Sequence, residues 1–151
     1  MRLVLDTNIV MDMLHFADRH THALRIALNH GHMTCFTDSE CLAELERVSR
    51  YPEFGLDLPA RNALIEGYRG IATLCDASGV EDYLLPRCRD RDDQKFLVLA
   101  ARSKADLLIT RDKMLLKLVR NRRNPPPCPI VTAETAETLL QLAPENPAGF
   151  V

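Results

Sequence analysis

Residues 92–119, which read "DDQKFLVLAARSKADLLITRDKMLLKLV", decide the fold class of this chain. The apolar residues Phe96, Leu97, Ala100 and Ala101 recur at steps of three and four, which predicts a helix from Asp92 or Asp93 to Ser103. Residues 107–109 are apolar throughout and predict a buried strand, and residues 113–119 predict a second helix. A strand between two helices indicates an α/β unit with helices packed on its sheet.

The same alternation of strands and helices continues along the rest of the chain. Thr37 and Glu40 match a capping box, Pro52 ends the helix that follows it, and Gly31 suits a C-terminal cap. Strands that are apolar throughout, alternating with helices, predict an α/β fold with a mostly parallel sheet covered on both faces. The further strands are expected at 3–5 and 32–36, the further helices at 8–14, 21–30, 37–48 and 59–74, and a last strand and helix within 129–142.

Length and composition limit the class of protein. A chain of 151 residues has the usual size of one domain, so we expect a single domain over 1–142 followed by a loose C-terminal tail over 143–151. The composition, with 46% hydrophobic and 26% charged residues, is that of an ordinary soluble globular protein. The net charge of -2 argues against binding nucleic acid through overall charge, but it leaves room for a local basic patch.

The lack of a recognisable targeting signal and the spacing of the cysteines favour a cytoplasmic protein without a membrane partner. The sequence shows no signal-peptide pattern and no apolar run long enough to span a bilayer. The five cysteines contain no C-x-x-C pair, so we expect reduced and mostly buried thiols in place of a zinc site.

Two aspartates follow predicted strands. Asp6 comes directly after "LVL", and Asp112 follows "LLIT" with one residue between them. Ligand sites of parallel sheets lie at the carboxyl ends of the strands, so these carboxylates could meet there. For either residue alone, a role in a turn or a helix cap is an equally good explanation.

Two further acids lie on faces that could reach the same edge. Asp93 shares the apolar face of its helix, while Asp90 or Asp92 can supply the N-cap. Glu44 lies at the margin of the apolar stripe of its own helix, and its alternative is a solvated pair with Arg47. Asp12 lies off the apolar stripe of the first helix, where we expect it to be solvated.

Four converging carboxylates would repel one another unless protons or cations compensated them. Oxygen ligands favour Mg²⁺ or Mn²⁺ over zinc, and Mg²⁺ commonly shares its coordination sphere with substrate phosphate. Such a site suits hydrolysis of a phosphodiester by an activated water, with no side-chain nucleophile.

Two clusters of basic residues have competing explanations. The cluster near the end of the predicted 113–119 helix is either a charged helix end or a rim that contacts RNA phosphates. It consists of Lys113, Lys117, Arg120, Arg122 and Arg123, of which the first three are the RNA-contact candidates. The histidines His15, His20 and His22 are expected at the solvated end of the first helix, since no cysteine completes a metal site there.

Four ordered motifs resemble the PIN domain family of small metal-dependent ribonucleases. They are "LDTN" at 5–8, "SECLAEL" at 39–45, "RDRDDQKFLVLAA" at 89–101 and "ADLLITRD" at 105–112. The closest resemblance is to bacterial PIN proteins classed as toxin components of toxin–antitoxin pairs. The resemblance implies a three-layer α/β/α sandwich around a central, mostly parallel sheet.

The resemblance also implies an active site. It assigns catalysis and metal binding to Asp6, Glu44, Asp93 and Asp112. Supporting polar positions fall on Thr7 or Asn8 and on Thr110, and the extra acids Asp90 or Asp92 could substitute for Asp93 or assist it. The implied activity is that of an endoribonuclease dependent on Mg²⁺ or Mn²⁺, with RNA as substrate and a cognate antitoxin as partner. The oligomeric state stays open, with a homodimer among the alternatives.

Two other classes of protein fit the sequence less well. A catalytically degenerate module that binds RNA or an antitoxin would not need all four acids. A receiver-like phosphoacceptor domain would need an acidic pair after its first strand and an aspartate after a central strand, and the sequence offers neither.

Overall fold

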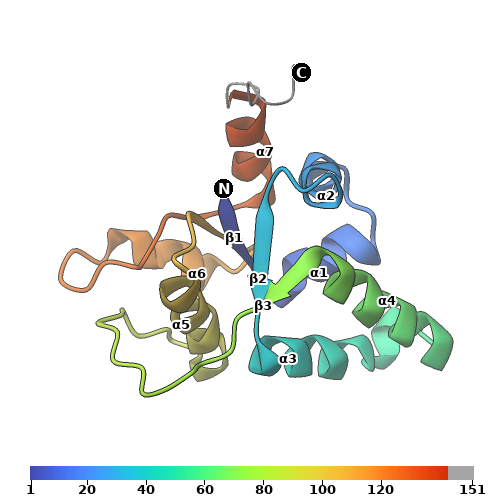
Figure 1. The fold of residues 1–151 in the computed structure, drawn as a ribbon, viewed down its shortest axis with the longest axis horizontal. Coiled ribbons are helices and arrows are strands. Elements are labelled where there is room, and N and C mark those ends of the chain that lie inside the picture. Colours follow the sequence, from blue (N-terminus) through green and yellow to red (C-terminus); the bar gives the residue numbers. More distant parts are fainter. Residues whose placement is uncertain (143–151) are drawn as a thin grey trace.

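A parallel sheet forms the centre of the molecule (Figure 1). The computed structural model describes residues 1–142, so the tail predicted at 143–151 lies outside the described residues. Five strands follow the order β3-β2-β1-β4-β5, and every neighbouring pair is parallel. This confirms the predicted α/β fold. The strands are β1 (Arg2–Leu5), β2 (Thr34–Thr37), β3 (Ala72–Leu74), β4 (Leu107–Ile109) and β5 (Ile130–Val131).

Alternation along the central strand β1 divides the apolar residues between two cores. Leu3 and Leu5 belong to one cluster of buried side chains, and Val4 belongs to the other. Successive side chains of a strand point to opposite faces, so a strand apolar at every position needs helices on both sides. The uninterrupted apolar run over residues 3–5 is therefore explained by the three layers.

The helices cover both faces of the sheet. Leu64 of α4 (Leu58–Ile71) packs in the core with Leu3 and Leu5, together with apolar residues of α1 (Thr7–Leu14), α2 (His22–Asn29) and α7 (Ala133–Leu142). Phe96 of α5 (Gln94–Ser103) and Leu115 of α6 (Lys113–Leu116) pack in the core with Val4. α3 (Ser39–Ser49) contributes to both cores, and the 3₁₀ turns are η1 (Arg19–Thr21), η2 (Pro52–Phe54), η3 (Arg91–Asp93) and η4 (Lys117–Arg120).

Three predicted boundaries are wrong. The helix predicted to end at residue 74 ends at Ile71, because residues 72–74 pair with β2 as a mostly exposed edge strand that lacks an apolar signature. α3 is capped by Asp38, whose Oδ1 accepts a bond from the Cys41 N–H at 2.8 Å, so Thr37 forms no capping box. α1 begins at Thr7, which places Asn8 inside the helix.

Two further local expectations have mixed outcomes. Gly31 follows α2 with a φ of +72°, which confirms the expected C-terminal glycine. His20, expected at a solvated helix end, instead lies in η1 with its ring 3.1 Å from a Glu137 oxygen and 3.4 Å from a Glu134 oxygen of α7. Among the residues that the structure describes, no helix has the length and apolar character needed to cross a membrane.

The layered packing predicts a large cost for truncating a central strand residue. Leu108 is fully buried in β4 beneath α5, so Leu108→Ala should lower the free energy of unfolding by about 2–5 kcal/mol, through lost burial and a residual cavity. Leu84→Ala is the matched control: that side chain is 80% exposed, and its truncation should cost less than about 0.5 kcal/mol. Urea denaturation measures both values, and equal costs would contradict the core assignment.

Candidate active site

Asp6 and Asp112 meet at the carboxyl edge of the sheet through Thr110. The Asp6 N–H donates to the Ile109 carbonyl at 2.9 Å, which extends the β1–β4 ladder by one bond. The Thr110 hydroxyl donates to Asp6 Oδ2 at 2.7 Å and accepts the Asp112 N–H at 2.9 Å. Asp6 is 5% exposed and Thr110 is fully buried. One hydroxyl therefore fixes the Asp6 carboxylate and the backbone that carries Asp112.

Asn8 makes a second link between the same two strand ends. Its side-chain amide donates to Asp6 Oδ2 at 3.3 Å, and its carbonyl accepts the Arg111 N–H at 3.3 Å. Asn8 thus hydrogen-bonds to both strand ends, and its supporting role toward a ligand or water stays a prediction. Asp112 itself caps α6, with Oδ1 accepting the Met114 N–H at 2.8 Å.

Asp93 completes a group of three carboxylates. It lies at the junction of η3 and α5, partly buried, and its carboxyl shares a hydrogen bond with Asp112. Burial, this hydrogen bond and the negative charge of Asp6 raise the pKa of Asp93 to about 7. Burial also raises the pKa of Asp6, and the charges of Glu44 and Asp112 add to the effect while the Thr110 hydrogen bond opposes it. Burial and the charges of neighbouring carboxylates therefore both oppose ionisation of Asp6 and of Asp93.

The neighbouring acids Asp90 and Asp92 take different positions. Asp90 caps η3 by accepting the Asp92 N–H at 3.0 Å, and its charge contributes to the raised pKa of Asp93. The Asp92 side chain is exposed, and its backbone carbonyl accepts a hydrogen bond from the Lys95 ammonium. Of the three acids in this run, Asp93 is the one that lies among the strand-end carboxylates.

Glu44 approaches the group, but both of its oxygens are engaged. Its Oε2 accepts the Thr7 hydroxyl, and its Oε1 lies 2.7 Å from Lys95 Nζ and 3.7 Å from Arg47 Nη2. The Glu44 and Lys95 side chains are only 11% and 13% exposed, so this ion pair is mostly shielded from water. The expected alternative, a pair with Arg47, is thus present beside a stronger one with Lys95.

The three basic RNA-contact candidates lie on exposed surface next to Asp112. Lys113 opens α6, and Lys117 and Arg120 begin and end η4. None of them forms an ion pair within residues 1–142.

Sequence reasoning missed Lys95 and Arg111. Arg111 Nε donates to Asp12 Oδ2 at 2.7 Å, and its Nη2 donates to Oδ1 at 3.2 Å. The expectation that Asp12 is solvated is therefore wrong: it is 9% exposed and ties α1 to the β4–α6 loop. Arg111 lies between Thr110 and Asp112 in the "ADLLITRD" motif, and this position could have marked it as a candidate site residue. Lys95 lies 51 positions from Glu44 in the sequence, and no local pattern connects them.

The donor set fits a hard divalent cation. Within residues 1–142, no Lys, Arg or His pairs with Asp6, Asp93 or Asp112, although Glu44 has its own cation. Like charges in a partly buried group call for a proton or a cation, and carboxylate oxygens are ligands that Mg²⁺ and Mn²⁺ accept. In the same part of the chain, no three His, Cys, Asp or Glu side chains are already arranged to hold a metal. The fit therefore rests on donor chemistry and charge.

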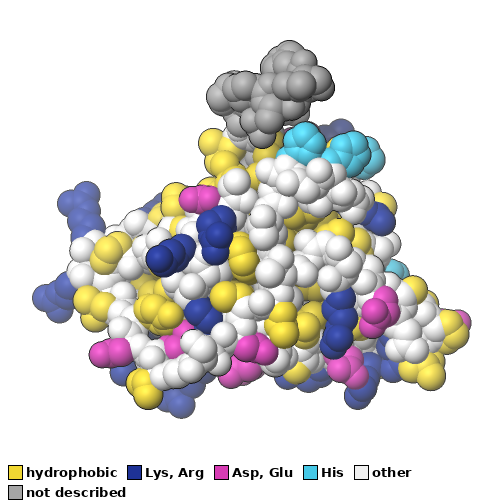
Figure 2. Space-filling view, viewed as in Figure 1, with side chains coloured by type: hydrophobic (Ala, Val, Ile, Leu, Met, Phe, Trp, Pro, Cys, Tyr) yellow, Lys and Arg dark blue, Asp and Glu magenta, His cyan; other side chains and the backbone are white. Residues whose placement is uncertain are grey.

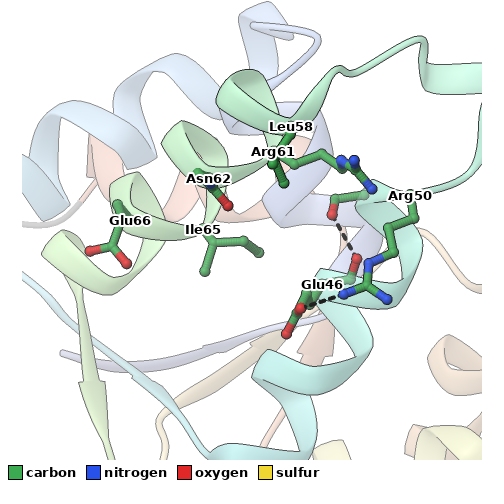
Figure 3. A pocket seen from close by; sticks show the side chains of 8 residues that line it. Glu46, Arg50, Leu58, Arg61, Asn62, Ile65 and Glu66 are labelled. Carbon is green, nitrogen blue, oxygen red and sulfur yellow. Dashed lines mark hydrogen bonds and ion pairs between the residues drawn. The ribbon is translucent and has the colours of Figure 1, made fainter.

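A separate hollow of about 480 Å³ lies between α3 and α4 (Figure 3). Glu46 and Arg50, paired at 2.7 Å, lie on one side, and Leu58, Arg61, Asn62 and Ile65 line the other. None of the carboxylates at the sheet edge lines this hollow, so it lacks the chemistry of the site described above.

The raised pKa of Asp93 predicts a pH-dependent loss of stability without metal. The Asp93 carboxyl has a higher pKa in the folded protein than in the unfolded chain. Its contribution to the stability of the folded protein is therefore fully present below the unfolded pKa of 3.8 and is lost as the pH rises through about 7. In EDTA, Asp93→Asn should therefore be more stable than the wild type at pH 8 by on the order of 1 kcal/mol, discounted for solvent exposure, with no gain at pH 4.

Thermal unfolding at the two pH values measures this difference. Asp82→Asn, on the exposed part of the 75–90 connection, is the control and should behave like the wild type at both. A gain at pH 4 equal to the gain at pH 8 would show that the carboxyl charge is not the cause.

The comparison with known proteins agrees with this geometry. A family model described as PIN domain matches residues 2–114. No curated protein and no solved structure matches the chain. The match runs from β1 into α6 and includes all four acids of the predicted site, over well more than half of the chain. The chain therefore belongs to the PIN domain family.

Proposed function

We propose that this protein is a divalent-metal-dependent endoribonuclease that hydrolyses RNA phosphodiester bonds. PIN domains are generally nucleases, so the family supports a hydrolase acting on nucleic acid. The observation that carries the proposal is the group formed by Asp6, Asp93 and Asp112, in which one buried and two partly buried carboxylates lie at the same edge of the sheet and no cation of residues 1–142 pairs with them. Mg²⁺ or Mn²⁺ is the proposed cofactor.

Each residue has a distinct part in the proposed reaction. Asp6, Asp93 and Asp112 supply the oxygens that would hold the cation, and Glu44 stands at the margin of the group, clamped by Thr7 and Lys95. Thr110 and Asn8 keep Asp6 in one orientation. A bound divalent cation would polarise the phosphodiester and lower the pKa of an attacking water. The protein then needs no covalent nucleophile.

The resemblance to toxin-type PIN proteins supports a proposal for the biological role. We propose that the protein acts in the cytoplasm as the toxin of a toxin–antitoxin pair, with RNA as its substrate and a cognate antitoxin as its partner. The exposed cations Lys113, Lys117 and Arg120 beside Asp112 support contact with RNA phosphates.

Substitution of the strand-end acids tests the nuclease proposal. Asp6→Asn and Asp112→Asn keep the size of the side chains and remove their charge. Each should reduce Mn²⁺-dependent cleavage of RNA by about a hundredfold or more, since even the loss of a group that only hydrogen-bonds a metal ligand costs about 10- to 100-fold. Asp82→Asn serves as the control and should cleave at the wild-type rate. Wild-type cleavage by both acid variants would refute the proposed site.

One observation favours a second candidate, a PIN-like module that binds RNA or an antitoxin without cutting. The Glu44 carboxylate is already neutralised by Lys95, which is what a degenerate site would show. The two candidates differ in their response to Lys95→Gln. In the nuclease, losing this competing cation should tighten Mn²⁺ binding by about fivefold to tenfold, because a shielded pair of this kind is worth about 1 kcal/mol.

Titration calorimetry with Mn²⁺ distinguishes the candidates. Lys104→Gln removes a lysine charge at the far end of α5 and should leave the affinity unchanged. If neither the wild type nor Lys95→Gln binds Mn²⁺ in the millimolar range, the binding module is the correct description.

A further inference from the structure

A pocket of about 640 Å³ lies beside Asp93, between α5 and the long connection from β3. The connection contributes Tyr83, Arg87 and Arg89 to its wall, η3 contributes Arg91, and α5 contributes Val98. In Figure 2, basic, acidic and hydrophobic side chains lie together over this part of the surface, at the lower left. The pocket and its arginines were not among the candidate sites expected from the sequence.

Hydrogen bonds hold the connection in place, so the pocket is formed without a ligand. Gln94 donates to the Pro86 carbonyl at 3.0 Å and accepts the Cys88 N–H at 2.8 Å. Arg102 binds both oxygens of Glu81, at 2.8 Å and 2.6 Å, and donates to the Cys75 carbonyl at 2.7 Å. These contacts attach the connection to α5 at the connection's beginning, middle and end.

The charge of the pocket is positive. Arg87, Arg89 and Arg91 are exposed, and none of them forms an ion pair within residues 1–142. Glu81 is the acid among the residues that line the pocket, and Arg102 neutralises it. Three unpaired guanidinium groups, each able to bind phosphate oxygens in a bidentate manner, thus surround one hollow.

The pocket adjoins the carboxylates. Gln94, which lines it, follows Asp93 directly, and Cys88 lies in its wall. Burial raises the pKa of the Cys88 thiol to about 12, and the charges of Asp93, Asp112, Asp90 and Asp6 contribute. The carboxylates are therefore within electrostatic range of the pocket wall. A positive hollow directly beside an acidic site is the arrangement needed to hold a polyanion whose backbone crosses that site.

We propose that this pocket binds a nucleotide of single-stranded RNA next to the bond that is cleaved, with Arg87, Arg89 and Arg91 on its phosphates and Tyr83 against its base. The Tyr83 side chain is 41% exposed, and Leu85 and Val98 supply apolar surface nearby. Single-stranded RNA combines a phosphate backbone with bases free to stack on aromatic rings, which matches this lining. The inference takes its substrate class from the proposed ribonuclease function.

Binding is tested in the Asp6→Asn background, so that the RNA stays intact, by fluorescence anisotropy of a short labelled single-stranded RNA. Replacing Arg87 and Arg89 together with Gln should weaken binding at least about tenfold and reduce the slope of log affinity against log salt by about 1.4, or roughly 0.7 for each lost phosphate contact. Tyr83→Ala should weaken binding by about tenfold with an unchanged salt slope, because stacking is not ionic.

The control replaces two exposed arginines elsewhere, Arg19 in η1 and Arg69 in α4, with Gln, and it should bind like the background protein. Equal weakening by this control, or unchanged RNA affinity after the pocket substitutions, would overturn the proposal. The proposal would also be overturned if the pocket substitutions weakened binding of an acidic peptide and left RNA binding unaffected, since the pocket would then receive a protein partner.

The experiments distinguish failure of the proposed RNA subsite from failure of the proposed nuclease activity. If the wild type cleaves RNA with Mn²⁺ and the pocket variants bind RNA normally, the subsite is wrong and the nuclease stands. If the pocket variants lose RNA binding but the wild type never cleaves, the pocket is an RNA site on a module that does not cut.

Discussion

Asp6, Asp93 and Asp112 bring like charges together at one edge of the sheet, and the contacts around them must hold them there against that repulsion. Three carboxyl groups converge at the end of a parallel sheet, and burial and mutual charge raise the pKa of Asp93 and Asp6. The fold tolerates this cost because strand pairing and the Thr110 hydroxyl hold the groups in place. A site kept at the expense of stability is what a protein built for charge-dependent chemistry would show.

The packing around the site holds each acid from a different direction. β1 and β4 carry Asp6 and Thr110, both buried at the sheet edge, while the start of α5 brings in Asp93. The Asp12–Arg111 pair ties α1 to the loop before α6. The long connection after β3, which has no regular structure of its own, is fastened to α5 by Gln94 and Arg102. Helix α5 therefore positions both Asp93 and one wall of the arginine-lined pocket.

The sequence predicted the features that depend on local pattern. Apolar runs such as Leu107–Ile109 gave the strand positions and the sheet class, and the order of the acidic motifs gave the family. It failed where distant contacts decide the outcome. β3 forms because β2 offers it a partner, Asp12 is buried because Arg111 reaches it from 99 positions away, and Lys95 meets Glu44 only in the folded chain. The positions of the individual acids as metal ligands remain a prediction.

Anomalous diffraction from a crystal soaked in Mn²⁺ would locate a cation bound at these carboxylates. We predict a strong anomalous peak in contact with carboxylate oxygens of Asp6, Asp93 and Asp112, with Lys95 still bound to Glu44 or displaced from it. A peak that touches other residues, or the absence of any peak at millimolar Mn²⁺, would contradict the claim that these carboxylates exist to hold a divalent cation.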